Sequence, residues 1–402
     1  MVSMTTTHTS LAKPSVSALA MLLSSQLASA AAFVDVHTQQ FTDRPIPRFV
    51  ADAAWPTMPD DRMFGQVPGL ALDADDNVWI LQRPNSLGFS DTGLAQSPPI
   101  AVCCRPAPHL LQFSPAGELL ASWGGPEHAP TLDGVNQWPA NVHGLHVAED
   151  GSLWIGGNGD GDHVVLNFSP EGEFLRSFGR RNATAGNFDR STLGGPGDIA
   201  TIPGTGEALV ADGYINKRII GFDSKGQFTR YWGAYGASPD DQTREGAFDQ
   251  SQASSNSDGG ADPESKSFGD IVHCVVNGPD NRIYVCDRRN NRLQIFETDA
   301  QGDTRFVKNV VIAASTGGTR TVSDVAFSPD GKYLYVADMM NGQVWILDAE
   351  THEALGALGR NGRYPGQFIW LHSVVVDSEG NIYTSEVSTG RRVQKFVFRG
   401  IE

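Results

Sequence analysis

The chain repeats one pattern about every fifty residues, and this repeat restricts the fold more than any other feature of the sequence. One half of the pattern is an aromatic residue, a turn and a strand that ends in Trp-Gly or Phe-Gly. Clear copies occupy residues 113–124, 168–179 and 222–233, and weaker copies begin at Phe296 and Leu347. A segment that returns this regularly is one structural unit that packs against its own copies.

The other half of the pattern is a β-hairpin. Its copies occupy residues 69–83, 144–155, 198–212, 274–287, 324–338 and 373–386. Two hairpins give four strands, and a four-stranded unit at this spacing is a propeller blade. We count six blades and predict an all-β, six-bladed β-propeller; the regular alternation disfavours a β-sandwich or two smaller β-domains. The last blade has one clear outer strand, at 392–398, so the segment around 47–50 is expected to complete it and close the ring.

Residues 33–402 are expected to form this single domain, with two insertions at one rim of the ring. The first insertion is 84–106. The second is 235–267, which is rich in Ser, Asp, Gly and Gln and is therefore predicted to be flexible.

Residues 1–32 have the pattern of a secretory signal peptide. Lys13 precedes an apolar run at 16–27, and Ala28-Ser29-Ala30 matches a cleavage site. A disordered tail is the alternative. The apolar run is too short and too polar to span a membrane. A signal peptide predicts a secreted or periplasmic protein.

Composition restricts the partners. The formal net charge is -16 and the sequence pI is about 5.0, with no basic cluster. An acidic chain of this kind is not expected to bind nucleic acid or an anionic membrane. We expect a monomer that binds a small-molecule or peptide-like ligand.

The four cysteines leave their redox state open. A turn centred near Asp280 would place Cys274 across from Cys286, where either a disulfide or two buried thiols would fit. The adjacent Cys103 and Cys104 could form a vicinal bridge or stay reduced. No CxxC spacing typical of zinc sites occurs.

Aligning the inner hairpins on their turns shows which residue stands just ahead of each one. In blade order these residues are Pro68, His143, Gly197, His273, Ser323 and His372. Alternate blades of a six-fold ring lie about 120° apart, so histidines in blades two, four and six would converge on the ring axis. A single histidine at a strand start is more often structural, but three in register suit Zn²⁺ with an open coordination position. We predict a zinc site at His143, His273 and His372.

The ends of the second strands add polar residues to the same rim. Arg83 ends that strand in blade one, Tyr214 follows it in blade three, and Arg288 follows it in blade four. Two arginines suit bidentate binding of a substrate carboxylate, and a phenol beside Zn²⁺ and an arginine could ionise and act as a base. Salt bridges for the arginines and an exposed loop for the tyrosine are the structural alternatives.

Four stretches, at 65–73, 143–145, 211–219 and 287–296, carry a family resemblance. On these stretches the chain resembles NHL-repeat six-bladed propellers and, among them, the peptidyl-α-hydroxyglycine α-amidating lyases. The resemblance spans roughly residues 55–398. It implies that His143, His273 and His372 are zinc ligands. It also implies that Tyr214 is the catalytic base and that Arg83 and Arg288 bind the substrate.

The chain also departs from that family. Trp370 stands where the family has a methionine, so the resemblance places Trp370 in an altered substrate wall. The family's structural calcium would bind the backbone carbonyls of Leu70 and Leu145, but Ser373 replaces the aspartate that completes the site, which argues against calcium. Residues 158–162 could form an unrelated calcium loop, although a solvated turn is favoured.

The resemblance implies a metal-dependent carbon–nitrogen lyase that splits an α-hydroxyglycine hemiaminal into an amide and glyoxylate, or that acts on a related small carboxylated substrate. One alternative is a lactonase-like propeller hydrolase, but such enzymes typically use Glu, Asn and Asp around calcium, and the three histidines argue against it. A second alternative is a non-catalytic NHL scaffold, which would need neither a metal nor the histidines.

Overall fold

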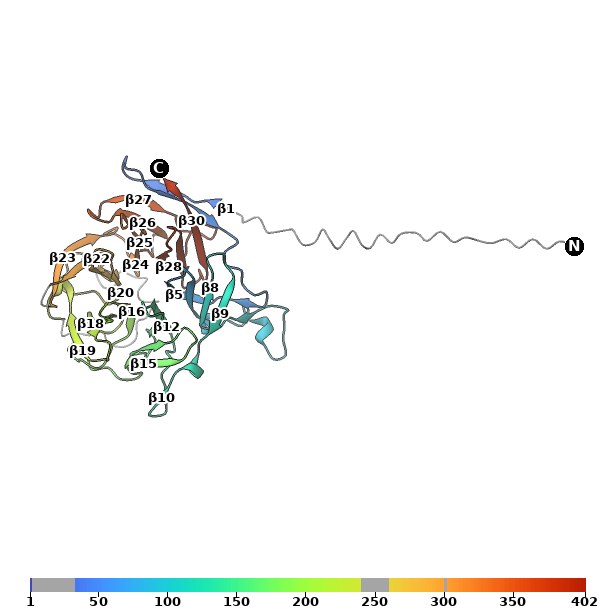
Figure 1. Cartoon of the computed structure of the whole chain (residues 1–402), viewed down its shortest axis with the longest axis horizontal. Coiled ribbons are helices and arrows are strands. Elements are labelled where there is room, and N and C mark those ends of the chain that lie inside the picture. Colours follow the sequence, from blue (N-terminus) through green and yellow to red (C-terminus); the bar gives the residue numbers. More distant parts are fainter. Residues whose placement is uncertain (2–32, 240–259, 300–301) are drawn as a thin grey trace. The chain divides into compact units, whose positions relative to one another are not determined.

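The structure is a computed structural model that describes Met1 and residues 33–239, 260–299 and 302–402. Residues 33–402 form one compact unit. Six sheets of four or five antiparallel strands in the described residues circle a common axis, with the innermost strands β5, β12, β16, β20, β24 and β28 around the centre (Figure 1). The predicted six-bladed propeller is confirmed.

From the inside outward, blade one consists of β5 (Gln66–Leu72), β6 (Val78–Arg83), β8 (Leu110–Phe113) and β9 (Leu119–Trp123), and blade two of β12 (Val142–Val147), β13 (Leu153–Gly157), β14 (Val164–Phe168) and β15 (Phe174–Gly179). Blade three consists of β16 (Pro196–Thr201), β17 (Ala208–Asp212), β18 (Arg218–Phe222) and β19 (Phe228–Trp232), and blade four of β20 (Val272–Asn277), β21 (Arg282–Asp287), β22 (Arg292–Thr298) and β23 (Thr304–Val311). Blade five consists of β24 (Val322–Phe327), β25 (Tyr333–Asp338), β26 (Gln343–Asp348), β27 (Ala354–Leu358) and β2 (Thr38–Gln40), and blade six of β28 (Leu371–Val376), β29 (Ile382–Glu386), β30 (Val393–Ile401), β3 (Pro47–Asp52) and β1 (Phe33–Asp35). Short elements in the connections are β4 (Arg62–Met63), β7 (Arg105–Pro106), β10 (Thr131–Leu132), β11 (Val135–Asn136), η2 (Pro84–Ser86), η3 (Gly93–Ala95), η4 (Pro126–His128), η5 (Ala234–Gly236) and η6 (Arg288–Asn290).

The N-terminal part of the propeller closes the ring, as predicted. Strand β3 pairs with β30, so that Phe49 lies opposite Phe398 and Val50 opposite Val397. The last blade therefore takes its fourth strand from the beginning of the domain, and the sheet edge that β30 would otherwise expose is covered.

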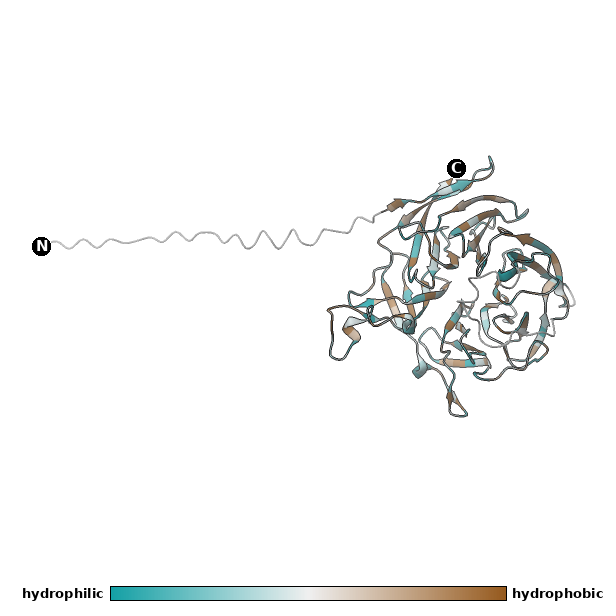
Figure 2. Ribbon diagram, turned by 180° about the vertical axis from the view of Figure 1, so that it is seen from behind, coloured by the Kyte–Doolittle hydropathy of each residue, from teal (hydrophilic) through white to brown (hydrophobic). Residues whose placement is uncertain are grey.

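The core consists of six apolar clusters among the described residues, one between each pair of neighbouring blades. Successive residues of a strand point to opposite faces of the sheet. Trp79 and Leu81 of β6 therefore pack toward blade two, whereas Val78 and Ile80 pack toward the last blade. Figure 2 shows such apolar residues along strands around the ring.

Each of the six inner hairpins has an irregularity in its strand pairing at the residue that the repeat alignment identified. In the even blades the register shifts at His143, His273 and His372, and it shifts at the equivalent place in the odd blades. A bulged residue leaves the ladder of strand hydrogen bonds, and its side chain is re-aimed. The bulges thus let the rings of the three histidines face the ring axis, and the backbone carbonyls of Pro68, Gly197 and Ser323 face those rings.

Both cysteine pairs are joined by disulfides. Cys274 of β20 lies opposite Cys286 of β21, as the hairpin predicted, and their Cα atoms are 4.8 Å apart. Cys103 and Cys104 form a vicinal disulfide in the first insertion.

The described ends of the second insertion are joined to blade four by hydrogen bonds. The buried Arg292 donates hydrogen bonds to the carbonyls of Pro263 (2.9 Å) and Ser265 (2.7 Å) and to the Tyr235 hydroxyl (3.1 Å). The flexibility of the insertion at 235–267 stays a prediction, and its middle, at 240–259, lies outside the described residues.

The predicted signal peptide also falls outside the described residues, apart from Met1. In the described part of the chain, no helix is both long enough and apolar enough to cross a bilayer.

Candidate metal centre and substrate pocket

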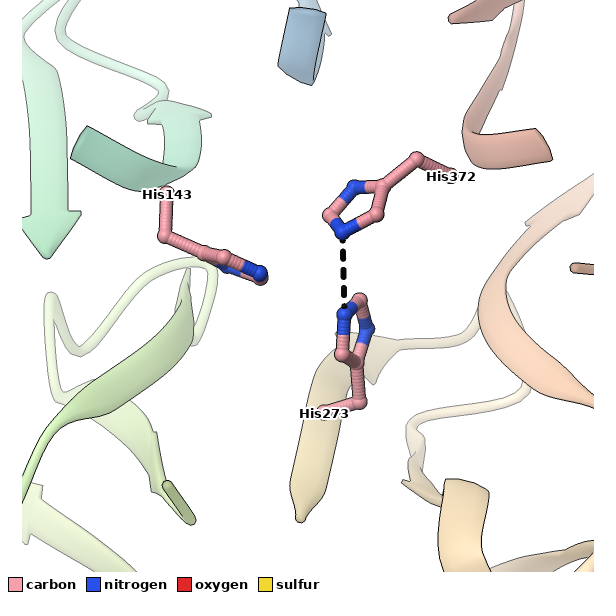
Figure 3. Close-up of side chains that lie close together, drawn as sticks. All are labelled: His143, His273 and His372. Carbon is pink, nitrogen blue, oxygen red and sulfur yellow. Dashed lines mark hydrogen bonds between the residues drawn. The ribbon is translucent and has the colours of Figure 1, made fainter. Parts of the chain in front are cut away.

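Three buried histidines from alternate blades meet at the ring axis. The ring centroids of His143, His273 and His372 are separated by 4.9, 4.8 and 4.7 Å, which is close to an equilateral triangle. The rings point to a common centre (Figure 3), and their ligand nitrogens lie within 4.8 Å of one another. The predicted convergence is therefore present, and this group could hold a metal ion.

The backbone of the odd blades fixes the tautomer of each histidine. The Nδ1 atom of His143 lies 2.6 Å from the carbonyl oxygen of Gly197. His273 and His372 make the same contact with the carbonyls of Ser323 (2.5 Å) and Pro68 (2.7 Å), which are the equivalent residues of the next blades.

A carbonyl oxygen only accepts hydrogen bonds, so each Nδ1 carries the proton and each neutral ring turns an Nε2 lone pair to the centre. The Nε2 atoms of His273 and His372 lie 3.2 Å apart. Converging lone pairs repel one another, and a cation between them removes the repulsion. The donor set thus fits a metal that prefers imidazole nitrogen.

The surroundings keep these histidines neutral. Burial lowers the pKa of His143, His273 and His372 well below the usual value. The positive charge of Arg288 lowers the pKa of all three further, and that of Arg83 lowers the pKa of His143 and His372. A neutral imidazole is the form that binds a metal, so protons do not compete for these nitrogens near neutral pH.

Tyr214 lies directly beside the histidines, in the turn after β17. Its hydroxyl oxygen is 2.7 Å from Nε2 of His143. Because that nitrogen is an acceptor, the tyrosine donates the hydrogen bond. The turn is held by the buried carboxylate of Asp212, which accepts from the backbone N–H of Gly194 (2.6 Å) and from Nε of Arg218 (2.9 Å). Tyr214 and a metal ion would compete for the same lone pair.

Arg83 is oriented by three hydrogen bonds. Its Nε donates to the carbonyl of Val142 (2.8 Å), one terminal nitrogen to Gln66 (2.9 Å) and the other to Oδ1 of Asn158 (3.3 Å). A guanidinium group has five N–H donors, so one remains on each terminal nitrogen, which is the arrangement for bidentate binding of a carboxylate. Burial lowers the pKa of Arg83 to about 10, so it stays charged at neutral pH.

Arg288 follows β21 in the short helix η6 and is buried. Burial lowers the pKa of Arg288, and a hydrogen bond with Tyr214 opposes this shift. Nη1 of Arg288 also lies 4.0 Å from the sulfur of Met339. The two predicted arginines are therefore brought to the same site as the tyrosine.

A cavity of about 90 Å³ joins these groups. It is lined by Arg83, Asn141, His143, Asn158, Tyr214, Arg288, Thr319, Met339, Trp370, His372 and Val387. None of these described lining residues carries a carboxylate, and two are arginines, so the cavity suits a small anion. Trp370 lies in the wall, as the resemblance implied.

Sequence reasoning missed several lining residues. Met339 follows Asp338 at the end of β25 just as Arg288 follows Asp287 at the end of β21, so aligning the second strands would have identified it. Asn141 precedes the β12 bulge in a segment outside the repeat. Asn141 and Thr319 have no comparable signal in the sequence.

The loop at 158–162 is a structural turn and not an open calcium site. The fully buried carboxylate of Asp162 accepts hydrogen bonds from the backbone N–H groups of Ala140 (2.9 Å), Asn141 (2.8 Å) and Gly159 (3.1 Å) and from Nε of Arg181 (3.0 Å). These protein donors satisfy the carboxylate, so the residues form a turn, but Asp162 is fully buried in it and not solvated as predicted.

An axial channel of about 620 Å³ lies on the other side of the histidines, and Leu70 and Leu145 line it. Two partly buried carboxylates line it, those of Asp198 in blade three and Asp324 in blade five, and Ser373 donates a hydrogen bond of 2.7 Å to Asp324. Burial raises the pKa of Asp324 to about 6, and burial together with repulsion by Asp324 raises the pKa of Asp198. The argument from Ser373 against calcium at the Leu70 and Leu145 carbonyls stays a prediction.

The fold and the site define the class of protein: a six-bladed β-propeller with a buried three-histidine centre on its axis. Within this class, the chain resembles NHL-repeat propellers and the peptidyl-α-hydroxyglycine α-amidating lyases, as the sequence predicted. Two of these relatives are named as amidating lyases, and the third is named for its NHL repeats.

Three curated relatives illustrate the similarity. Peptidyl-glycine alpha-amidating monooxygenase of Mus musculus is 24% identical over 333 residues, which cover 81% of this chain and 30% of the mouse protein. Peptidyl-alpha-hydroxyglycine alpha-amidating lyase 1 of Drosophila melanogaster is 23% identical over 382 residues, with 88% and 60% coverage. NHL repeat-containing protein 3 of Homo sapiens is 23% identical over 299 residues, with 72% and 73% coverage. The chain spans about a third of the length of the amidating monooxygenases that it matches.

Two further comparisons concern the architecture. A family model described as "Lactonase, 7-bladed beta-propeller" matches residues 240–373, whereas the described chain forms six blades. The solved structure of a candidate gluconolactonase has a TM-score of 0.50 at 11% identity and covers 90% of this chain and 98% of that structure. At this identity the likeness shows the propeller fold alone.

Proposed function

We propose that the protein is a zinc-dependent lyase that splits the α-hydroxyglycine hemiaminal of an N-acylated compound into an amide and glyoxylate. The observation that carries the proposal is the convergence of three unprotonated Nε2 atoms below a cavity that contains Tyr214 and two arginines. Three imidazoles with an open position are a donor set of catalytic zinc sites. The relatives named amidating lyase support the same reaction.

Zinc held by His143, His273 and His372 would stabilise the negative charge that develops on the substrate oxygen. The two remaining N–H groups of Arg83 and the nearby guanidinium of Arg288 would bind the substrate carboxylate. This placement fixes the α-carbon between the arginines and the phenol oxygen of Tyr214, and such positioning lowers the entropic part of the barrier.

Tyr214 would act as the base in its ionised form. It takes the proton of the α-hydroxyl group, and the oxygen electrons form the carbonyl of glyoxylate. The carbon–nitrogen bond then breaks, and its electron pair moves to the nitrogen. Tyr214 returns the proton to that nitrogen, so the products are an amide and glyoxylate and no other reactant is consumed.

The two disulfides support the proposal that the protein works outside the cytoplasm. Disulfides persist in oxidising compartments such as the periplasm and the extracellular space. This placement agrees with the signal peptide that the N-terminal sequence predicts.

A lactonase-like hydrolase is the second candidate, because the lactonase family model matches part of the chain. Hydrolases of that kind use carboxylates around calcium, and no described residue that lines the cavity beside the histidines has a carboxylate. The site chemistry therefore favours the lyase.

The test is the release of glyoxylate from N-acetyl-α-hydroxyglycine by the zinc-loaded protein, with gluconolactone hydrolysis measured in parallel. We expect glyoxylate to form in proportion to enzyme concentration and gluconolactone to stay intact. Hydrolysis of the lactone without release of glyoxylate would overturn the lyase proposal in favour of the hydrolase.

A further inference from the structure

We infer that Asn141 and Asn158 form a binding site for the amide group of the substrate, so that the enzyme selects N-acyl compounds over N-alkyl ones. The inference deepens the proposed function and rests on it. Both side chains line the cavity next to Arg83, yet neither has a part in the chemistry described above.

The contact with Arg83 fixes the orientation of both amides. Nη2 of Arg83 lies 3.3 Å from the Asn158 side chain, and a guanidinium group can only donate, so the Asn158 oxygen faces the arginine. The same oxygen lies 2.6 Å from the Asn141 side chain, which must therefore present its NH₂ group.

This orientation leaves one donor and one acceptor for a ligand. Within residues 33–239, 260–299 and 302–402, neither the NH₂ group of Asn158 nor the side-chain oxygen of Asn141 has a protein partner. An amide carries one N–H and one C=O, so it is complementary to this pair. The Asn141 oxygen would accept from the substrate N–H, and the Asn158 NH₂ would donate to the substrate carbonyl.

The surrounding structure holds both asparagines in place before a ligand binds. The carboxylate of Asp162 accepts from the backbone N–H of Asn141 (2.8 Å) and of Gly159 (3.1 Å), next to Asn158, and Arg181 anchors that carboxylate from behind. The backbone N–H of Asn158 also donates to the carbonyl of Asn141 (3.0 Å). A pair ordered in advance loses little conformational entropy on binding.

The pair predicts a substrate class. In the proposed reaction the leaving group is an amide, and it keeps its carbonyl throughout. An N-acyl-α-hydroxyglycine, including one at the end of a peptide, would satisfy both asparagines. An N-alkyl analogue would leave the Asn158 NH₂ group without its acceptor, and unsatisfied polar groups in a site discriminate strongly between ligands.

The test measures binding to the zinc-loaded full chain by calorimetry with three unreactive carboxylates. N-acetylglycine has the amide, levulinate replaces its N–H by CH₂, and pentanoate lacks both polar groups. We expect each hydrogen bond to contribute about a 10-fold difference in Kd, so the order of affinity is N-acetylglycine, levulinate, pentanoate. N141A should abolish the preference for N-acetylglycine over levulinate.

A second variant keeps the test valid if N141A does not fold. N158D retains the oxygen that faces Arg83 and replaces only the NH₂ group, so it should abolish the preference for levulinate over pentanoate. Equal weakening of all three ligands in either folded variant would overturn the inference, because the substituted asparagine would then only support Arg83. Failure of the wild type to release glyoxylate would instead contradict the proposed function. The binding result would still test the inference, because the three carboxylates are unreactive.

Discussion

The hydroxyl group of Tyr214 donates a 2.7 Å hydrogen bond to Nε2 of His143, the nitrogen that faces the centre of the three histidines. The tyrosine is thus within reach of any atom bound at that centre. Its position follows from the Asp212–Arg218 pair, which holds the turn after β17. The proposed base and one proposed metal ligand are therefore positioned by adjacent parts of blades three and two.

Tyr214→Phe should lower glyoxylate release by about 10²- to 10⁴-fold, the usual contribution of a general base. Bound zinc should be retained, because the phenylalanine ring preserves the packing on His143 and removes only the hydroxyl group. Turnover and metal content are both measured. Tyr364→Phe, at a side chain that is 77% exposed, is the matched control. Wild-type turnover in Tyr214→Phe would remove the tyrosine from the mechanism.

Loss of the Cys274–Cys286 disulfide, by changing both residues to serine, should lower the free energy of unfolding by about 2–4 kcal/mol. The bridge joins the strand that carries His273 to the strand that leads to Arg288. Changing Cys103 and Cys104 to serine should have no such effect, because that bridge closes no chain loop. Denaturant unfolding measures the free energy of unfolding of the two double variants. Equal decreases in the two would contradict the prediction.

Arg218→Met should destabilise the fold by about 3–5 kcal/mol, because it leaves the carboxylate of Asp212 buried and unpaired. Both side chains of this ion pair are 0% exposed. Arg180→Met removes the exposed pair with Asp133 and should cost less than about 0.5 kcal/mol. Urea unfolding measures both variants. A similar small loss in each would show that the buried pair does not hold the turn.

Asp198→Asn should raise stability more at pH 8 than at pH 5. The pKa of Asp198 is raised in the folded protein, mainly by burial and also by Asp324. The folded wild type therefore binds the proton more tightly than the unfolded chain, and its stability falls as the pH rises through the folded pKa. An asparagine side chain does not titrate, so the variant lacks this loss of stability at high pH. Its side-chain oxygen can still accept the hydrogen bond from the backbone N–H of Val275.

The measurement is urea unfolding of the metal-free wild type and variant at both pH values. Metal-free protein excludes the pH dependence of metal binding, and the titration of the histidines cancels because it is the same in both chains. A stability difference that does not change between pH 5 and pH 8 would contradict the prediction.

The sequence predicted the propeller because each blade repeats the same apolar alternation and the same turn. It also predicted the three histidines, since they occupy one position of the repeat in alternate blades. The ring closure by β3 followed from a missing outer strand in the last blade. These features depend on side-chain type and spacing, which a sequence displays directly.

Other parts of the site depend on backbone atoms and on loops, and these leave little trace in a sequence. The carbonyls of Pro68, Gly197 and Ser323 set the histidine tautomers, yet a carbonyl is common to every residue. Asn141 and Asn158 meet only because the turn at Asp162 folds back on the segment before β12.

The metal content of the purified protein shows whether His143, His273 and His372 bind zinc. Wild-type protein should contain one zinc ion per chain. His273→Ala should lose it, whereas His146→Ala should keep it, because His146 lies on the same inner strand as His143 but bonds Thr201 instead of facing the centre. Wild-type protein without a stoichiometric transition metal, or His273→Ala with an undiminished zinc content, would contradict the account.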